Sequence, residues 1–194
     1  RLEKENISII KSTGYVLAED IISNKNIPEF NNSAMDGFGV ISNDTSNASK
    51  KNPIILKILE TIPAGKIPTN KLTQGNSVRI MTGSAIPEGC DAVIPFEYTN
   101  FPKINQKKVK IYQQLTSGQN IRYIGEDIKE NQKILSIGST LNASNIGLIA
   151  SLGIEYIKVF RKPLISIIST GDELVSPGQK KKPGQIYDSN SYSI

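Results

Sequence analysis

The chain has 194 residues, 38% of them hydrophobic and 21% charged, which is typical of a folded protein of one or two domains rather than a disordered one. It contains no histidine and one cysteine, Cys90, which excludes within the chain an imidazole base, a Ser-His or Cys-His nucleophile, an internal disulfide and a thiolate zinc site. A metal bound here needs oxygen ligands, and this favours a hard cation such as Mg²⁺.

The net charge of +5 favours an anionic partner, but the lysines are scattered, tryptophan is absent, and seven tyrosines and five phenylalanines supply few stacking platforms for bases. An anionic small-molecule substrate explains the charge equally well, and we expect no nucleic-acid partner. No apolar run approaches the roughly 20 residues that span a bilayer, and the charged first five residues are not followed by the apolar core of a signal peptide. We therefore expect a cytoplasmic protein without a membrane partner.

The first part of the chain is predicted to be rich in β-structure. Residues 14–22 have the pattern of a strand, and from residue 28 to about 117 short β-prone runs alternate with turns of Gly, Pro and Asn. Strands at this spacing are typical of a small sandwich or barrel. The predicted strands cover residues 54–59, 78–81, 92–94 and 109–112.

After residue 138 the pattern changes to a helix followed by a strand. Asn142 is the predicted N-cap of a helix with Ile146 and Ile149 on its apolar face, and Gly153 is the predicted C-terminal stop. Residues 156–160 alternate as a strand should.

A hinge at residues 161–163 leads to the run LISIIS at residues 164–169, which is typical of a parallel strand buried on both faces. Asp188 and the residues after it have the pattern of a helix N-cap. A strand buried on both faces needs neighbouring strands and covering helices that do not follow in this sequence. We therefore expect an incomplete α/β unit over residues 163–194.

The segment NNSAMDGF, residues 31–38, is the first candidate site. Its Asp36-Gly37 dipeptide most often forms a type I′ hairpin turn, which needs positive φ at both central residues. The cluster of Asn32, Ser33 and Asp36 also offers short polar side chains to an anion or a hydrated cation. The sequence leaves both interpretations open, and the turn is the commoner one.

The segment RIMTGS, residues 79–84, is the second candidate. The hydroxyls of Thr82 and Ser84 follow a predicted strand, and the intervening glycine allows a ligand to approach the backbone, so an oxyanion can bind here. A simple exit from strand to turn is the commoner interpretation.

The third candidate lies in GQNIRYIGED, residues 118–127. Glu126 and Asp127 can ligate Mg²⁺, and Arg122 can pair with a phosphate or a carboxylate. The commoner alternative is an exposed turn with a surface ion pair that contributes only ~0–1 kcal/mol.

The fourth candidate is TGDE, residues 170–173, which directly follows the predicted buried strand. Open α/β sheets bind ligands beyond the carboxyl ends of their strands. Thr170 supplies a hydroxyl, Gly171 allows close approach, and Asp172 with Glu173 supplies carboxylates for metal binding or base chemistry. A capped helix start is the alternative.

The order of these segments resembles the molybdopterin molybdenumtransferase family, which includes the E domain of gephyrin. The matching series is PEFNNSAMDGF, RIMTGSAIPEG, GQNIRYIGEDI, STGDEL and GQIYDSNS, and it extends from about residue 14 to residue 190. The resemblance implies a multidomain, mixed α/β fold. Residues 1–27 plus 128–162 would form an interrupted α/β linker and dimerisation domain, residues 28–127 an inserted β-rich domain, and residues 163–194 the truncated start of a three-layer α/β molybdopterin-binding domain.

The resemblance also implies a reaction. Molybdate and adenylylated molybdopterin are the substrates, Mg²⁺ is the cofactor, and molybdenum is placed on the dithiolene with release of AMP. The partners implied are a second subunit, in a homodimer whose active cleft is shared between subunits, and molybdopterin adenylyltransferase as the upstream enzyme.

Family motifs assign roles to nine positions of this sequence. The catalytic residues would be Asp36, Thr82, Asp127 and Glu173, of which the first three would reach the cleft of the other subunit. The residues for cofactor binding would be Ser33, Thr170, Gly171, Asp172 and Asp188, and the metal would be held by Glu173 and Asp172.

Two departures qualify this expectation. Phe38-Gly39 stands where many members have Tyr-Ala, which we expect to be tolerated, and the sequence ends before the remaining substrate loops and the fourth domain. We therefore expect this fragment to be inactive by itself. A peptide-binding scaffold of the gephyrin type is the alternative function, and a nucleic-acid-binding β domain is a third.

The third interpretation has a direct test. We expect no binding of a short single- or double-stranded DNA in fluorescence anisotropy at roughly 50 mM salt, because stacking platforms are few and the lysines are scattered. Binding that weakens steeply when salt rises to roughly 200 mM would contradict this expectation.

Overall fold

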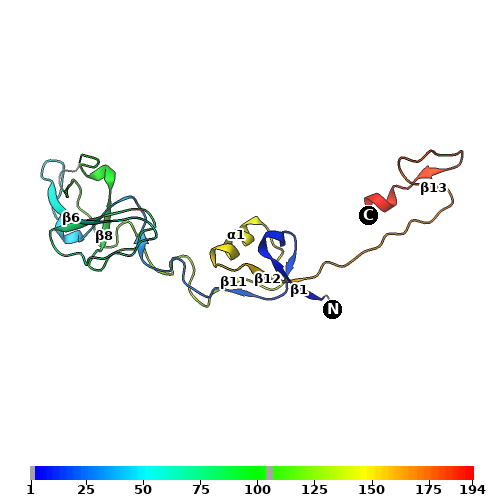
Figure 1. Cartoon of the computed structure of the whole chain (residues 1–194), viewed down its shortest axis with the longest axis horizontal. Helices are drawn as coiled ribbons and strands as arrows, with labels where there is room; N and C mark the ends of the chain where they lie inside the picture. Colours follow the sequence, from blue (N-terminus) through cyan, green and yellow to red (C-terminus); the bar gives the residue numbers. More distant parts are fainter. Residues whose placement is uncertain (1–2, 104–106) are drawn as a thin grey trace.

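The structure is a computed structural model and describes residues 3–103 and 107–194. Figure 1 shows an elongated arrangement, with a β-rich part at one end, a middle part that contains α1 and the N-terminal strands, and a C-terminal segment that extends away from both. The described residues are mostly β-strand with few helices, which is less helix than the predicted mixed α/β class implies. In this same part of the chain, no helix has the length and apolar character to cross a membrane.

The β-rich part is built on a five-stranded sheet with the strand order β8-β5-β7-β6-β9. Its neighbouring strands are antiparallel except for β6 and β7. Thr99, just beyond one edge strand, bridges Ile111 at the end of the opposite edge strand, so the sheet curls into a barrel-like shape. The strands are β5 Gly37–Val40, β6 Ile54–Ile62, β7 Asn76–Ile80, β8 Ala92–Pro95 and β9 Lys108–Ile111. All four predicted runs are therefore strands, with slightly different ends.

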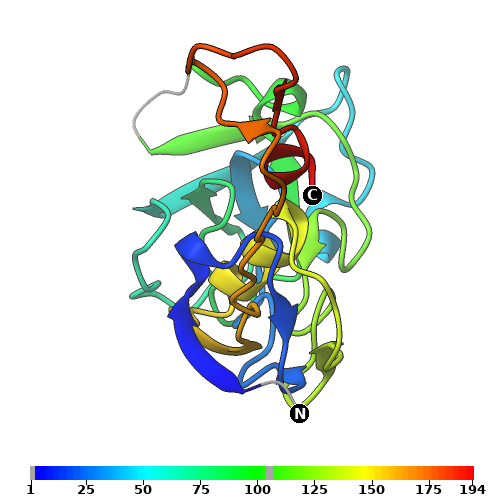
Figure 2. The same ribbon diagram turned by 90° about the vertical axis from the view of Figure 1, so that its right-hand side faces the viewer.

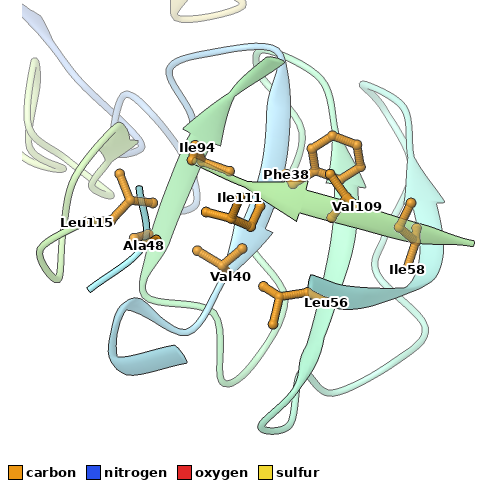
Figure 3. Packing of buried hydrophobic residues seen from close by; sticks show 10 residues of the cluster. Phe38, Val40, Ala48, Leu56, Ile58, Ile94, Val109, Ile111 and Leu115 are labelled. Carbon is orange, nitrogen blue, oxygen red and sulfur yellow. The ribbon is translucent and has the colours of Figure 1, made fainter. Parts of the chain in front are cut away.

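Alternate side chains of these strands fill the interior of the barrel, as Figure 3 shows. A bulge in β6 between Ile58 and Thr61 turns Ile62 to the opposite face, where it joins a second core that covers the outside of β7. The short helices η2 Ser42–Thr45 and η3 Phe96–Tyr98 lie in the connections. The interior cluster contains Phe38, Val40, Ala48, Leu56, Ile58, Ala92, Ile94, Val109, Ile111 and Leu115, and the outer one Ile62, Leu72, Val78, Ile80 and Val93.

The predicted type I′ turn at Asp36-Gly37 does not form. Gly37 has no positive φ and is the first residue of β5. The preceding strand, β4 Asn32–Ser33, pairs with β10 Ile121–Arg122 instead of returning along β5. Glycine is needed at this position for another reason, because an added Cβ atom would lie 1.9 Å from the carbonyl oxygen of Ile94 on β8.

The middle part combines a three-stranded sheet, of order β1-β12-β2, with helix α1. Leu17, Leu141, Ile149 and Val159 are buried in its core. The elements are β1 Lys4–Ser8, η1 Ile9–Lys11, β2 Val16–Leu17, α1 Ala143–Ser151 and β12 Tyr156–Phe160. The predicted strand at residues 14–22 is divided, because β2 pairs with β12 while β3 Ile21–Ile22 pairs with β11 Lys133–Leu135.

The predicted helix and strand after residue 138 are both confirmed. Asn142 accepts a hydrogen bond of 2.9 Å from the backbone N–H of Asn145, and the Asn145 side chain accepts one of 3.2 Å from the Asn142 N–H. This reciprocal capping box satisfies two backbone donors at the start of α1. Gly153, with φ +76°, follows the helix end as expected for a left-handed C-terminal residue.

The chain leaves the middle part and returns to it along one paired path (Figure 1). Ile27 bridges Ile128 between the β3–β11 pair and the β4–β10 pair. Two antiparallel segments therefore connect the β-rich part to the middle part. The division into residues 1–27 plus 128–162, 28–127 and 163–194 stays a prediction.

The run at residues 164–169 is not the buried strand that its composition predicts. It has no strand partner in the described structure, and Leu164 and Ile168 are 92% and 82% exposed. In both views it forms an extended stretch before the next element (Figure 1, Figure 2). An apolar run becomes a buried strand only when neighbouring strands and helices cover it, and here none does. The remaining elements are the parallel pair β13 Leu174–Val175 and β14 Ile186–Tyr187, and helix α2 Asn190–Ser193.

The contact at Gly37 generates a stability prediction. Gly37→Ala should lower the free energy of unfolding by at least about 2 kcal/mol, because the added methyl group meets backbone and forces β5 and β8 apart. Gly147→Ala is the control: an added Cβ meets nothing within 4 Å in α1, and alanine should stabilise that helix by about 0.5–1 kcal/mol. Urea unfolding of both variants measures the difference, and equal stabilities would show that β5 and β8 do not approach this closely.

Candidate functional site

Asp36 and Thr82 meet at the end of the barrel sheet. β5 and β7 are antiparallel with Gly37 opposite Ile80, so the residue before β5 lies beside the turn that follows β7. Thr82 donates two hydrogen bonds to one oxygen of the Asp36 carboxylate, from its backbone N–H at 2.7 Å and from its hydroxyl at 2.9 Å. Both side chains are exposed, and the second oxygen of the carboxylate forms no hydrogen bond to residues that the structure describes.

These contacts determine the charge of Asp36. The backbone N–H of Thr82 and then its hydroxyl lower the pKa of Asp36 below its usual 3.8, desolvation opposes them, and the positive charge of Arg79 adds to the lowering. Asp36 is therefore ionised at neutral pH. Because its folded pKa is depressed, it favours the folded state at pH above about 3.8, and this contribution is lost as the pH falls through the folded value.

The two serines near this pair, Ser33 and Ser84, form hydrogen bonds inside the fold. The Ser33 side chain is fully buried, and its hydroxyl donates a hydrogen bond of 2.5 Å to the carbonyl of Met35. The Ser84 hydroxyl is also buried and donates at 2.9 Å to the carbonyl of Ile62. The backbone N–H of Ser33 donates to the Ser84 carbonyl at 3.0 Å, so the two serines hold the loop that carries Asp36. A role of Ser33 in binding a cofactor requires this loop to open.

Arg122 holds both carboxylates of the GED motif. Its Nε atom lies 2.6 Å from Glu126, and one of its terminal nitrogens lies 2.6 Å from Asp127. Glu126 and then Asp127 raise the pKa of Arg122, and Arg122 lowers the pKa of Glu126. This arrangement matches the surface ion pair better than a Mg²⁺ site, because the cation that balances both carboxylates is the guanidinium.

The Arg122–Asp127 pair and the Asp36–Thr82 pair are connected through the short β4–β10 pair. Arg122 on β10 lies opposite Asn32 on β4, the strand that leads into the Asp36 loop. The N–H of Ala34 also donates to the carbonyl of Asn120 at 3.0 Å. The structure thus anchors the Arg122–Asp127 pair and the Asp36–Thr82 pair to the same part of the barrel.

Asp188 organises the C-terminal segment. Its carboxylate accepts hydrogen bonds from the Ser191 hydroxyl at 2.5 Å, the Ser191 backbone N–H at 3.1 Å and the Ser169 hydroxyl at 3.0 Å. The bonds from Ser191, followed by that from Ser169, lower the pKa of Asp188. It accepts a bond from a backbone N–H in the first turn of α2, but the N-cap of that helix is Ser189, whose own side chain forms no capping hydrogen bond. Asp188 also lines an open pocket of about 500 Å³ with Pro177, Gly178, Tyr187, Ser189, Tyr192 and Ser193.

The remaining predicted residues, Thr170 to Glu173, are exposed. Asp172 and Glu173 form no ion pair with any residue that the structure describes, and across residues 3–103 and 107–194 no three acidic, His or Cys side chains are placed to hold a metal. Glu173 directly precedes β13, which Figure 1 places at the opposite end of the molecule from the β-rich part. Within one chain, Asp36 and Glu173 therefore do not meet.

Arg79 is a residue whose role the sequence reasoning did not identify. Its positive charge acts on Asp36, and its guanidinium lies 4.8 Å from the ring centroid of Phe101 and 5.5 Å from that of Phe96. The available signal was a lone arginine between Val78 and Ile80 in a strand with an otherwise apolar pattern.

The sequence matches a known family over most of its length. The model of the family described as "MoeA N-terminal region (domain I and II)" matches residues 1–153. The chain belongs to the MoeA family. The matched residues include the β-rich part and most of the middle part, and end before β12.

Relatives and solved structures extend the match to nearly the whole chain. It is 40% identical to "Molybdopterin molybdenumtransferase 2" of Mycobacterium tuberculosis over 188 residues. The aligned region covers 97% of this chain and 46% of the relative. The chain is 36% identical over 193 residues to "Molybdopterin molybdenumtransferase" of Bacillus subtilis, covering 99% and 45%. The molybdopterin biosynthesis MoeA protein of Pyrococcus horikoshii OT3 has a similar structure, with a TM-score of 0.83, 35% identity, and coverage of 92% of this chain and 46% of that one. The chain thus spans about half the length of the MoeA proteins it matches.

The Asp36–Thr82 geometry predicts a measurable change in acidity. Thr82→Val should raise the pKa of Asp36 towards its usual value, because the hydroxyl donor is lost while the backbone donor remains. Thr82→Ser keeps a hydroxyl and should leave the pKa nearly unchanged. Carbon-13 NMR titration of the Asp36 carboxyl carbon measures both variants, and identical midpoints in the two would mean that the hydroxyl bond is absent in solution.

Proposed function

We propose that this chain forms part of a molybdopterin molybdenumtransferase, which inserts molybdate into adenylylated molybdopterin and releases AMP in the final step of molybdenum cofactor synthesis. The observation that carries the proposal is the similarity to proteins of that name over 97–99% of the chain. Molybdopterin adenylyltransferase would supply the substrate, and the cytoplasm would be the compartment. Because the relatives are about twice as long, the activity belongs to the complete protein.

We assign Asp36, Thr82 and Asp127 to the part of the active cleft that the β-rich domain contributes. The support is their chemistry: Asp36 is ionised at neutral pH, is fixed by Thr82 through two hydrogen bonds, and keeps one carboxylate oxygen available. That oxygen can accept a hydrogen bond from a substrate or orient a bound water. Asp127 is already balanced by Arg122, whose remaining donors suit a phosphate oxygen.

We assign Glu173 and Asp172 to Mg²⁺, and Thr170, Gly171 and Asp188 to the bound substrate. Ser33 is fully buried and would join them only after its loop opens. The two adjacent carboxylates are exposed and have no basic partner among the described residues, and Mg²⁺ is commonly held by one or two carboxylates together with substrate phosphates. The residues present therefore fit the ion. When bound, it would neutralise charge on the phosphate oxygens of the substrate.

The cleft would be shared between two subunits of a homodimer. The support is the separation of the assigned residues: Asp36 and Thr82 lie in the β-rich part, whereas Glu173 precedes β13 at the far end of the same chain (Figure 1). A second copy would supply the set of residues that each cleft lacks. The alternative, a peptide-binding scaffold of the gephyrin type, predicts no turnover by the complete protein.

The test uses the complete protein and two variants, Asp36→Ala and Glu173→Ala. Each homodimer should lose about 100-fold or more of its activity, because each variant damages both clefts. Heterodimers that carry one variant subunit of each kind should regain one working cleft, in which Asp36 and Glu173 are both intact. Conversion of adenylylated molybdopterin and molybdate to active cofactor is the readout.

The matched control is Glu130→Ala, which removes an exposed carboxylate that forms no side-chain hydrogen bond or ion pair to any described residue. It should keep wild-type activity. Verified heterodimers that stay inactive would contradict the shared cleft, and full activity of the Asp36→Ala homodimer would contradict the role of Asp36.

A further inference from the structure

Arg79 points towards the interior of the barrel. On β7 it lies directly opposite Phe38 of β5, and residues that face each other across two strands project from the same side of a sheet. Phe38 belongs to the interior cluster, whereas the neighbours of Arg79 on β7, Val78 and Ile80, belong to the outer one. A charged residue thus occupies an interior-facing position of an apolar barrel.

The guanidinium rests on aromatic rings. Phe96 and Phe101 stack with their centroids 4.1 Å apart and their planes at 19°, and Arg79 lies 4.8 Å from the Phe101 centroid. Phe38 contacts Phe96 edge-on at 5.4 Å. A cation held against ring faces is attracted by their quadrupole.

This position leaves one donor unsatisfied. The Nε atom of Arg79 is buried and has no hydrogen-bond partner within residues 3–103 and 107–194. A buried donor without an acceptor is unfavourable, and an aliphatic side chain would pack here without that cost. The packing of the barrel therefore does not account for the arginine.

The same aromatic residue connects Arg79 to Asp36. The backbone N–H of Phe96 donates a hydrogen bond of 3.3 Å to the carbonyl oxygen of Asp36, while its ring lies beneath the guanidinium. Thr82, three residues after Arg79 on the same chain segment, holds the Asp36 carboxylate. Phe96 thus contacts both Arg79 and Asp36, and Thr82 joins the Asp36 carboxylate to the chain segment that carries Arg79. Arg79 forms no ion pair with Asp36 within the described residues, so its charge acts on the carboxylate from beyond contact distance.

We propose that Arg79 is a positioning residue of the Asp36 site, whose cation, fixed on the Phe96–Phe101 stack, orients the Asp36 carboxylate and keeps it paired with Thr82. The functional role of Asp36 rests on the proposed function, whereas the coupling of Arg79 to Asp36 does not. The groups that donate hydrogen bonds to the Asp36 carboxylate, the hydroxyl and the backbone N–H of Thr82, are neutral. Arg79 is the group that acts on this carboxylate through its charge.

The test is an NMR titration of the 194-residue chain with carbon-13 in the aspartate carboxyl groups. Arg79→Met keeps the apolar stem and removes the charge, so the Asp36 midpoint should move upwards and the Thr82 amide should exchange faster with solvent. Arg79→Lys keeps the charge and should keep the Asp36 midpoint close to that of the wild type. Lys110→Met is the control, because it removes an exposed charge from β9 of the same barrel and should leave Asp36 unchanged.

A second measurement needs no substitution. In the wild-type chain the Arg79 Nε–H resonance should shift with the same midpoint as the Asp36 carboxyl carbon. An Nε–H signal that does not respond while Asp36 titrates, or an Asp36 midpoint that is equal in folded Arg79→Met and Lys110→Met, would overturn the proposal. Unchanged turnover by the complete protein with Asp36→Ala would instead overturn the proposed function and leave this coupling in place.

Discussion

At Gly37, β5 lies so close to β8 that a Cβ atom would come within 1.9 Å of the Ile94 carbonyl oxygen. This contact fixes the residues on either side of the glycine. Asp36, immediately before it, is presented at the end of the sheet beside Thr82, and Phe38, immediately after it, enters the interior core. Both the position of the candidate site and the packing of the barrel therefore require a residue without a side chain at Gly37.

The carboxylates of the β-rich part and those of the C-terminal segment are held differently. In the β-rich part, Asp36 is bound by Thr82 and Asp127 by Arg122, so both have a defined direction before any ligand arrives. In the C-terminal segment, Asp188 is held by Ser169 and Ser191, whereas Asp172 and Glu173 are exposed. A preorganised group loses little freedom when a substrate binds. The carboxylates of the β-rich part are thus oriented before a ligand binds, whereas those of Asp172 and Glu173 are not held by any side chain that the structure describes.

Local patterns predicted the elements that depend on local interactions. The N-cap at Asn142, the strand at residues 156–160 and the four barrel strands follow from side chains a few positions apart. The type I′ turn, the commoner interpretation of Asp36-Gly37, does not form, and the glycine is needed instead because of a strand 57 residues away, at Ile94. The strand predicted at residues 164–169 was wrong because burial on both faces is a property of neighbouring segments, not of the run itself. The pairing of Asp36 with Thr82 followed from no spacing rule, since it needs the register of β5 on β7.

A crystal structure of the complete protein would test the central claim most directly, through the distances from the Asp36 carboxylate to the Glu173 carboxylate within one subunit and between the two subunits of the dimer. We expect Asp36 to be remote from Glu173 of its own chain and to face the groove beside Glu173 of the other chain. If Asp36 and Asp127 lay on a surface remote from that groove in both subunits, the shared active cleft would be contradicted.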